Sequence, residues 1–150
     1  MPEEGNKAVV RRFYEEVFNA GRLEAMDELV SPDLAAHDTL PPGVPERGPE
    51  PYKHTAAMFR SAFPDLHQEI EDMVAEGDKV AVRVTMTATH RGPFLGVAPT
   101  DRRVRYEGMD FFRFREGKMV EHWTATDDLG LMQQLGVVPS SEPWSRPLPE

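Results

Sequence analysis

The first third of the chain has its apolar side chains at helical spacing. Between residues 6 and 20 they recur three and four positions apart, which predicts an amphipathic helix. Asn6 can cap the start of this helix, and Gly21 can end it. Residues 23–30 keep the same spacing and predict a short second helix that stops at Ser31-Pro32.

A proline-rich stretch separates these helices from a third one. Residues 34–37 predict a brief extended segment, and residues 40–51 predict a loop because they contain five prolines and two glycines. Residues 52–63 return to helical spacing and put one apolar face toward a core. We expect this helix to end at Pro64-Asp65.

The pattern changes period after residue 65. Residues 66–75 and 80–90 predict strands, and the second of these alternates strictly between apolar and polar side chains. Residues 104–115 and 119–126 predict two further strands, joined by a tight turn at residues 116–118. The side chains of the most regular strand that we expect to face the core are Val80, Val82, Val84, Met86 and Ala88.

The remaining segments connect or follow the strands. Residues 91–101 carry two glycines and two prolines and predict a long excursion between strands. Residues 127–135 predict a closing helical turn that Gly136 ends. Residues 139–150 contain four prolines and predict a loose tail.

Three helices followed by hairpin-connected strands are typical of an α+β fold. Polar side chains alternate with the core-facing ones in these long hydrophobic strands. A curved sheet would bury part of both of its faces, which a flat sheet would not. A curved antiparallel or mixed sheet, packed with the three N-terminal helices, would enclose a pocket. We therefore predict one cone-shaped α+β domain over residues 1–138, followed by the proline-rich tail 139–150.

Composition narrows the function classes. The net charge of −9 repels a phosphate backbone and argues against nucleic acid as a partner. The chain has no cysteine, which excludes disulfides and thiolate metal sites and fits a reducing compartment. No signal peptide is recognisable, and no apolar stretch approaches the ~20 residues of a membrane span. We expect a soluble cytoplasmic protein without a membrane partner.

Several short motifs in the sequence resemble those of a known family. They are Phe63-Pro64-Asp65-Leu66, Glu76-Gly77-Asp78-Lys79-Val80, the run from Thr89 to Gly96, Pro99-Thr100, the run from Gly117 to Trp123, and the run from Asp127 to Gly136. In this order they resemble the SnoaL-like polyketide cyclases, or ester cyclases, of the superfamily that includes nuclear transport factor 2 and ketosteroid isomerase. The resemblance covers residues of about 6 to 137. It departs from the family pattern at Ala88 and Asp101, where glycine is frequent.

The resemblance implies a fold, a reaction and an assembly. The fold would be the α+β cone of nuclear transport factor 2, and the reaction an intramolecular aldol closure on a hydrophobic carbonyl substrate, by acid/base chemistry without a cofactor. The protein would form a homodimer through the outer face of its sheet. The same fold also hosts other reactions.

Asp127 is the first catalytic candidate. In the cyclases that this chain resembles, the aspartate of this motif is the general acid/base, and the period of two puts Asp127 on the sheet face of Trp123. In a dry pocket its pKa would rise toward neutrality. Asp127→Asn would then keep the fold and abolish turnover. Alternatively, Asp127 caps the helical turn that follows it, a place that Asp128 could also take.

Asp110 is the second catalytic candidate. It shares a strand face with aromatic residues, so its carboxyl group should be protonated or paired. Its position resembles that of the aspartate that holds the oxyanion in ketosteroid isomerases, whereas the alternative is an ion pair with Arg83 or Arg103. Asp38 similarly resembles the base of those isomerases but equally fits a surface turn.

His90 is the third catalytic candidate, because it ends a long strand and could bind a substrate oxygen or orient Asp127. The alternative is a structural histidine. Tyr14 lies one position from where the isomerases have their oxyanion tyrosine, which argues against steroid isomerisation, and we expect it to reach the cavity. The other residues that we predict to contact substrate are His37, Met58, Phe59, Phe63, Arg83, Phe112 and Trp123.

Other catalytic chemistries find no support in the sequence. The histidines have no spacing that forms a metal triad, so we predict no metal site. The lysines fall in surface contexts that do not favour a Schiff base, and no phosphate-binding glycine loop indicates a nucleotide. We therefore predict no cofactor.

Two further hypotheses stay open beside the cyclase. An epoxide hydrolase or dehydratase of this fold could activate water with Asp110, Arg83 and Asp127, and labelled oxygen from water would then appear in the product. A non-catalytic, dimeric small-molecule-binding domain would be stabilised by its ligand without changing it.

Overall fold

The structure is a computed structural model, and it describes residues 2–37, 43 and 46–139. Asp38, residues 40–42 and 44–45 of the predicted loop at 40–51, and the tail from residue 140 lie outside the described residues. Within the described part of the chain, no helix is long and apolar enough to cross a membrane.

The N-terminal helix is longer than predicted. α1 (Pro2–Arg12) continues directly into a wider π-helical stretch, η1 (Phe13–Asn19), which confirms the helix predicted over residues 6–20. It begins at Pro2 because proline and acidic side chains are favoured in a first helical turn. The hydrogen bonds of a π-helix join residues five apart, and the wider turn buries several neighbouring side chains together. These are Phe13, Tyr14, Val17 and Phe18.

The second and third helices lie close to their predicted positions. η2 (Leu23–Ala25) and α2 (Met26–Leu29) form the short second helix, and α3 (Glu50–Ala62) forms the third. α3 starts two residues early because Pro51 fits the first turn of a helix.

The first strand was predicted too short. β1 (Val30–Ala36) includes Ser31-Pro32, which we expected to end a helix. β1 is an edge strand that pairs in parallel with β5 (Lys118–Thr126), and its register is irregular between Val30 and Ala35. Pro32 is tolerated there because an edge strand does not need every backbone N–H for pairing.

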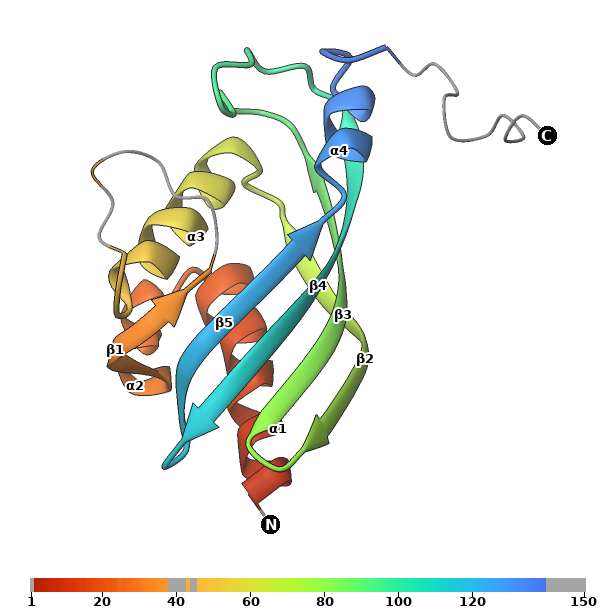
Figure 1. Ribbon diagram of the computed structural model, residues 1–150. Helices are drawn as coiled ribbons and strands as arrows, with labels where there is room; N and C mark the ends of the chain where they lie inside the picture. Colours follow the sequence, from red (N-terminus) through yellow and green to blue (C-terminus); the bar gives the residue numbers. More distant parts are fainter. Residues whose placement is uncertain (1, 38–42, 44–45, 140–150) are drawn as a thin grey trace, which may run out of the picture.

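Five strands form one curved sheet in the order β1-β5-β4-β3-β2. β2 (His67–Glu76), β3 (Lys79–Thr89), β4 (Arg103–Arg115) and β5 are joined by antiparallel pairing, as the hairpin pattern predicted. α1, α2 and α3 lie against one face of this sheet (Figure 1). The predicted α+β fold is confirmed.

The core lies between the helices and the concave face of the sheet. The five side chains of β3 that the alternation assigned to the core are all less than a tenth exposed. Aromatic side chains of η1 pack on them, so the helices close the concave face. The opposite, outer face of the sheet carries no helix in the described part of the chain (Figure 1).

The excursion between β3 and β4 is anchored to the end of α3. The backbone N–H groups of Arg91 and Gly92 both donate to the carbonyl of Ala62, at 2.9 and 3.0 Å. Gly92 passes so close to α3 that a Cβ atom there would lie 2.3 Å from the carbonyl oxygen of Ser61. The close approach of the two backbones therefore leaves no room for a side chain at residue 92.

We predict that Gly92→Ala lowers the free energy of unfolding by about 1–3 kcal/mol, because the backbones of the excursion and α3 must separate. Gly5→Ala is the matched control. It lies in α1 with no atom near its added Cβ, and alanine is the better helix former, so the variant should be as stable as the parent or slightly more so. Urea unfolding of both variants checks this, and equal midpoints would contradict it.

Candidate active site

A cavity of about 660 Å³ lies between the concave face of the sheet and the helices. Its size fits a drug-sized ligand. One wall is apolar and combines aromatic rings with flexible methionines. This wall consists of Phe13, Phe18, Met58, Phe59, Met86, Phe94, Leu131 and Met132.

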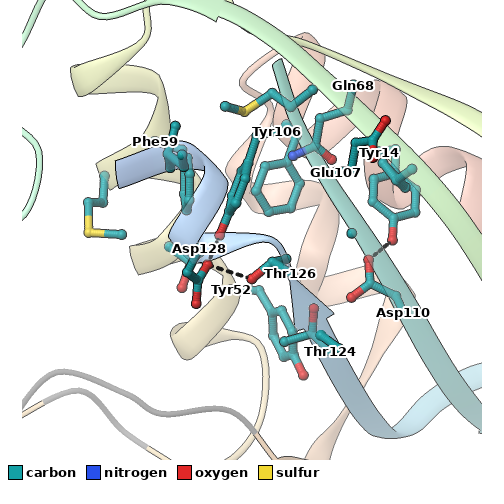
Figure 2. A pocket seen from close by; sticks show the side chains of 18 of the residues that line it. Tyr14, Tyr52, Phe59, Gln68, Tyr106, Glu107, Asp110, Thr124, Thr126 and Asp128 are labelled. Atoms are coloured by element: carbon teal, nitrogen blue, oxygen red, sulfur yellow. Dashed lines mark hydrogen bonds between the residues drawn. The ribbon is translucent and has the colours of Figure 1, made fainter. Parts of the chain in front are cut away.

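The polar side of the cavity comes from β4 and β5. Because side chains alternate between the two faces of a strand, Tyr106, Gly108 and Asp110 of β4 all lie on the concave face. The antiparallel register sets Asp110 opposite Thr124 and Gly108 opposite Thr126. Figure 2 shows these side chains converging on the cavity from the two strands.

Asp110 is the centre of a buried hydrogen-bond cluster. Its Oδ1 lies 2.9 Å from Nε2 of His122, and its Oδ2 accepts the hydroxyl proton of Tyr14 from η1 (Figure 2). Nδ1 of His122 lies 3.1 Å from the hydroxyl of Tyr52 on α3. The carboxyl group is therefore held by partners from β5 and η1, and Asp110 lines the cavity.

The cluster keeps Asp110 ionised. Burial alone would raise the pKa of the Asp110 carboxyl, but the hydrogen bond and charge of His122, with the hydroxyl of Tyr14, hold that pKa below its ordinary value. Burial and then the charge of Asp110 raise the pKa of Tyr14 well above that of free tyrosine. Tyr14 therefore stays a neutral donor to a carboxylate.

A second polar cluster lies where α4 (Asp128–Gln134) meets the cavity. The hydroxyl of Tyr106 and the hydroxyl of Thr126 both donate to Oδ1 of Asp128, the latter at 2.7 Å. Burial, and then the hydrogen bond to Asp128, raise the pKa of Tyr106. The cavity thus has two acidic centres, one on the sheet and one at the helix.

The charges that line the cavity are acidic or histidine side chains. Asp110 and Asp128 are joined by His37, His54 and His122, and no lysine or arginine is among the described lining residues. Glu107 also borders the cavity, but it alternates to the outer face of β4, where its carboxylate pairs with Arg105 at 3.2 Å. Within residues 2–37, 43 and 46–139, no three metal-binding side chains are grouped to hold an ion.

The structure places Asp127 outside the cavity, so its predicted position is wrong. Asp127 is exposed, and its carboxylate caps α4 by accepting a hydrogen bond from the backbone N–H of Gly130 at 3.0 Å. This is the alternative that the sequence left open, and the physical reason is that β5 ends at Thr126. The chain turns there, and strand alternation no longer sets the direction of Asp127. Asp128 enters the cavity instead.

The predicted cavity positions of Trp123 and Arg83 are also wrong. Trp123 lies on the outer face, edge-on to Phe111, because His122 takes the inward position of β5. Arg83 is on the outer face of β3, and its Nη2 lies 2.7 Å from a carboxylate oxygen of Asp72. Asp110, Arg83 and Asp127 are therefore not brought together as a water-activating trio, and Asp110 pairs with neither predicted arginine.

His90, Phe63 and Phe112 are buried beside the cavity without being among its described lining residues. His90 Nδ1 accepts the backbone N–H of Thr100 at 3.2 Å, so this histidine anchors the excursion between β3 and β4. Phe63 packs against its ring, and Phe112 stacks on His122 at 4.5 Å between ring centroids. Their predicted direct contact with substrate does not fit these positions.

The other predicted contacts do lie on the cavity. Tyr14, Met58 and Phe59 line its wall, and His37 lies at its edge, stacked on Trp123 at 4.8 Å. Whether they touch substrate stays a prediction.

Sequence reasoning missed His122, Tyr52, Tyr106 and Asp128. The alternation predicted that His122 and Trp123 lie on opposite faces of the sheet, but the sequence did not show which of the two faces is concave. The structure pairs Asp110 with Thr124 and so puts His122 on the face of Asp110, but this pairing follows a register shift between Arg113 and Phe114 that the sequence did not reveal. Tyr52 pairs with His122 from a distant helix, for which the sequence holds no signal.

Comparison with known proteins identifies related chains over nearly the whole domain. The family model described as SnoaL-like polyketide cyclase matches residues 8–135. Nogalonic acid methyl ester cyclase of Streptomyces nogalater is 30% identical over 128 residues, which are 85% of this chain and 91% of the relative. Aklanonic acid methyl ester cyclase AcmA of Streptomyces galilaeus is 30% identical over 142 residues, 91% of each chain.

Solved structures agree with these matches. TsrD from Streptomyces laurentii superposes with a TM-score of 0.81 at 30% identity, covering 90% of this chain and 97% of the other. AclR from Streptomyces galilaeus, which is described as a hydroxylase, gives 0.77 at 34% identity, covering 89% and 97%, and so agrees in fold. The resemblance predicted from the motifs is confirmed, and with it the prediction of a cyclase-type enzyme.

We predict a pH-dependent contribution of Asp110 to stability. A carboxyl group whose pKa is lowered by folding stabilises the folded state above its ordinary pKa, here 3.8, and loses this contribution as the pH falls through the folded value. At pH 7 the parent should exceed Asp110→Asn by about 1–3 kcal/mol in the free energy of unfolding. This difference should shrink below about pH 4.

Urea unfolding between pH 3 and pH 7 measures the difference. Asp72→Asn, which breaks an exposed ion pair on the outer face, is the control and should cost less than about 1 kcal/mol. A gap between parent and Asp110→Asn that stays constant over this pH range would refute the ionised, paired state of Asp110.

Proposed function

Because the chain belongs to the family of SnoaL-like polyketide cyclases, we propose that it closes a ring in a neutral polyketide ester by an intramolecular aldol reaction. The observation that carries this proposal is an ionised carboxylate, Asp110, held by His122 and Tyr14 inside an aromatic-walled cavity. Asp110 is thus a base in a cavity where the C–H group of a substrate can be removed from water.

Asp110 takes the proton from the reacting carbon. Its lowered pKa keeps the carboxylate ionised at neutral pH but also makes it a weak base. A weak base can remove a proton only from an activated carbon, such as one flanked by two carbonyl groups. The environment of Asp110 therefore favours a β-dicarbonyl unit at the bottom of the cavity.

His122 and Tyr52 position this base. The imidazole joins Asp110 to Tyr52, so its two ring nitrogens are both engaged, and the ring is clamped by stacking on Phe112. The carboxylate is therefore held in one orientation before substrate binds. Such pre-organisation avoids a reorganisation cost during the reaction.

The lining of the cavity supports an uncharged, ring-bearing substrate. Aromatic and methionine side chains suit a flat apolar ligand. Two acidic side chains, Asp110 and Asp128, and the absence of lysine and arginine among the described lining residues disfavour a free carboxylate. The names of two relatives give methyl esters as their substrates, which fits this charge argument. All steps are proton transfers and one carbon–carbon bond formation, so the proposal requires no cofactor.

We predict that the protein cyclises nogalonic or aklanonic acid methyl ester, and that Asp110→Asn lowers kcat by about 10²- to 10⁴-fold. Asp127→Asn is the matched comparison, because asparagine also caps helices well and the residue lies outside the cavity. It should retain turnover close to that of the parent. Steady-state kinetics followed by product chromatography measures both.

Unimpaired turnover in Asp110→Asn would remove Asp110 from the reaction. Loss of turnover in Asp127→Asn, with the fold intact, would return the catalytic role to the residue that the family motif predicted.

We also propose that two copies pair through the outer face of the sheet. This face exposes large apolar side chains, with Val74 65% and Met109 60% exposed, and Phe111 and Trp123 more than a third exposed. These side chains come from β2, β4 and β5 and no described helix covers them. A contiguous apolar face on a small domain indicates association, and two-fold pairing of identical faces is the commonest form.

We predict that Met109→Glu weakens this dimer at least about tenfold, because a two-fold axis brings the new charges together in an apolar interface. Val137→Glu is the control, since Val137 is an exposed apolar residue after α4 and outside the sheet. Light scattering with size-exclusion chromatography over a concentration series measures the dissociation constant. A monomeric parent at high micromolar concentration would overturn the proposal.

A further inference from the structure

We propose that Tyr106 is a second catalytic residue, the proton donor to the carbonyl oxygen that the new carbon–carbon bond attacks. Asp128 and Thr126 position its hydroxyl. This inference rests on the proposed aldol reaction and assigns the half of it that Asp110 does not perform.

Tyr106 and Asp110 face the cavity from the same strand, on either side of Gly108. Four residues of a strand separate their Cα atoms by roughly 13 Å. Gly108 has no side chain, and a Cβ atom there would lie 2.8 Å from Cγ2 of Thr126. The side chain of Thr126 takes up the space beside Gly108, and both residues line the cavity between Tyr106 and Asp110, so one substrate can contact the two groups along this wall.

The phenol of Tyr106 is fixed at both its ring and its oxygen. The ring stacks on Phe59 of α3 at 6.2 Å between centroids and 20° between planes. The hydroxyl donates to Oδ1 of Asp128, the same oxygen that accepts from Thr126 (Figure 2). When the proton of Tyr106 turns to a substrate oxygen, Thr126 still donates to Asp128, so the carboxylate does not lose its last donor.

Tyr14 does not fill this role. Its hydroxyl donates to Asp110, the base itself, and the residue is only 3% exposed. Turning the proton of Tyr14 to substrate would remove a donor from Asp110 in the buried cluster. Tyr106 is bonded to a different carboxylate, so its proton can move without disturbing the base.

The proton and electron balance of the step closes without a co-reactant. Asp110 takes the proton from carbon, and the electron pair of that C–H bond forms the new bond to the carbonyl carbon. The π pair of the carbonyl group moves to its oxygen, which takes the hydroxyl proton of Tyr106. Asp110 then returns its proton to water and the phenolate recovers one from water. Burial and Asp128 raise the pKa of Tyr106, so it holds its proton at neutral pH until an alkoxide, a stronger base, develops.

The test separates the two half-reactions. In D₂O, enzyme-dependent exchange of the acidic C–H of aklanonic acid methyl ester reports Asp110, and ring closure of the same substrate reports Tyr106. We expect Tyr106→Phe, which keeps the ring and its stacking, to retain exchange within about twofold and to lose ring closure by about 10²- to 10⁴-fold in kcat. Asp110→Asn should lose both.

Two further variants guard the interpretation. Asp128→Asn should lower ring closure by about tenfold and leave exchange unchanged, because it loosens the hold on Tyr106 without touching the base. Thr87→Val removes a hydroxyl from β3 on the outer face of the sheet and should change neither rate. Thermal melting establishes that each variant is folded.

The outcomes are distinguishable. Ring closure at the parental rate in folded Tyr106→Phe would overturn the inference and leave the proposed function intact. An equal loss of exchange and closure in that variant would also overturn it, since Tyr106 would then serve the base. A parent that neither exchanges nor cyclises would remove the proposed function itself, and the inference with it.

Discussion

The architecture of the site follows from burying one ionised carboxylate. A charge in the interior is tolerated only when its oxygens are hydrogen-bonded and its charge is offset. Asp110 meets this condition with His122 from β5 and Tyr14 from η1, and His122 is in turn held by Tyr52 from α3. A strand hairpin, β4 and β5, is thus tied to two helical segments that are distant in sequence, η1 and α3, by one hydrogen-bonded cluster. The π-helical widening of η1 contributes to this, because it turns Tyr14 inward together with Phe13.

Most of the fold could be predicted from the sequence. Strict alternation in residues 80–90 identified a strand and its core face, and helical spacing identified the segments around Phe13 and Phe59. These signals are local, since they depend on the side-chain period of one element at a time. The first half of β1, residues 30–33, escaped prediction because its pairing partner lies about ninety residues further along the chain, and Pro32 near its start mimics the end of a helix.

The site was harder to predict than the fold, for a geometric reason. Alternation divides the side chains of a strand into two sets but does not tell which set faces a cavity. Asp110 was correctly predicted to face the cavity. On β5, however, the prediction chose Trp123, which faces outward, instead of His122, which faces the cavity. Asp127 failed differently, because a single residue at a strand end decides whether a side chain continues the strand pattern or caps the next helix. Asp127 took the cap, and Asp128 entered the cavity.

The sheet that forms the floor of the cavity is one strand layer thick, and its reverse is the exposed apolar face. Along β4, Gly108 and Asp110 face the ligand space while Met109 and Phe111 face outward, so neighbours in the chain belong to opposite surfaces. The cavity wall and the surface that we propose for association are therefore encoded in interleaved positions of a single segment. Any evolutionary or engineered change that reshapes one surface acts on a backbone that the other surface shares, which confines independent adaptation of this protein to α3, α4 and the excursion between β3 and β4.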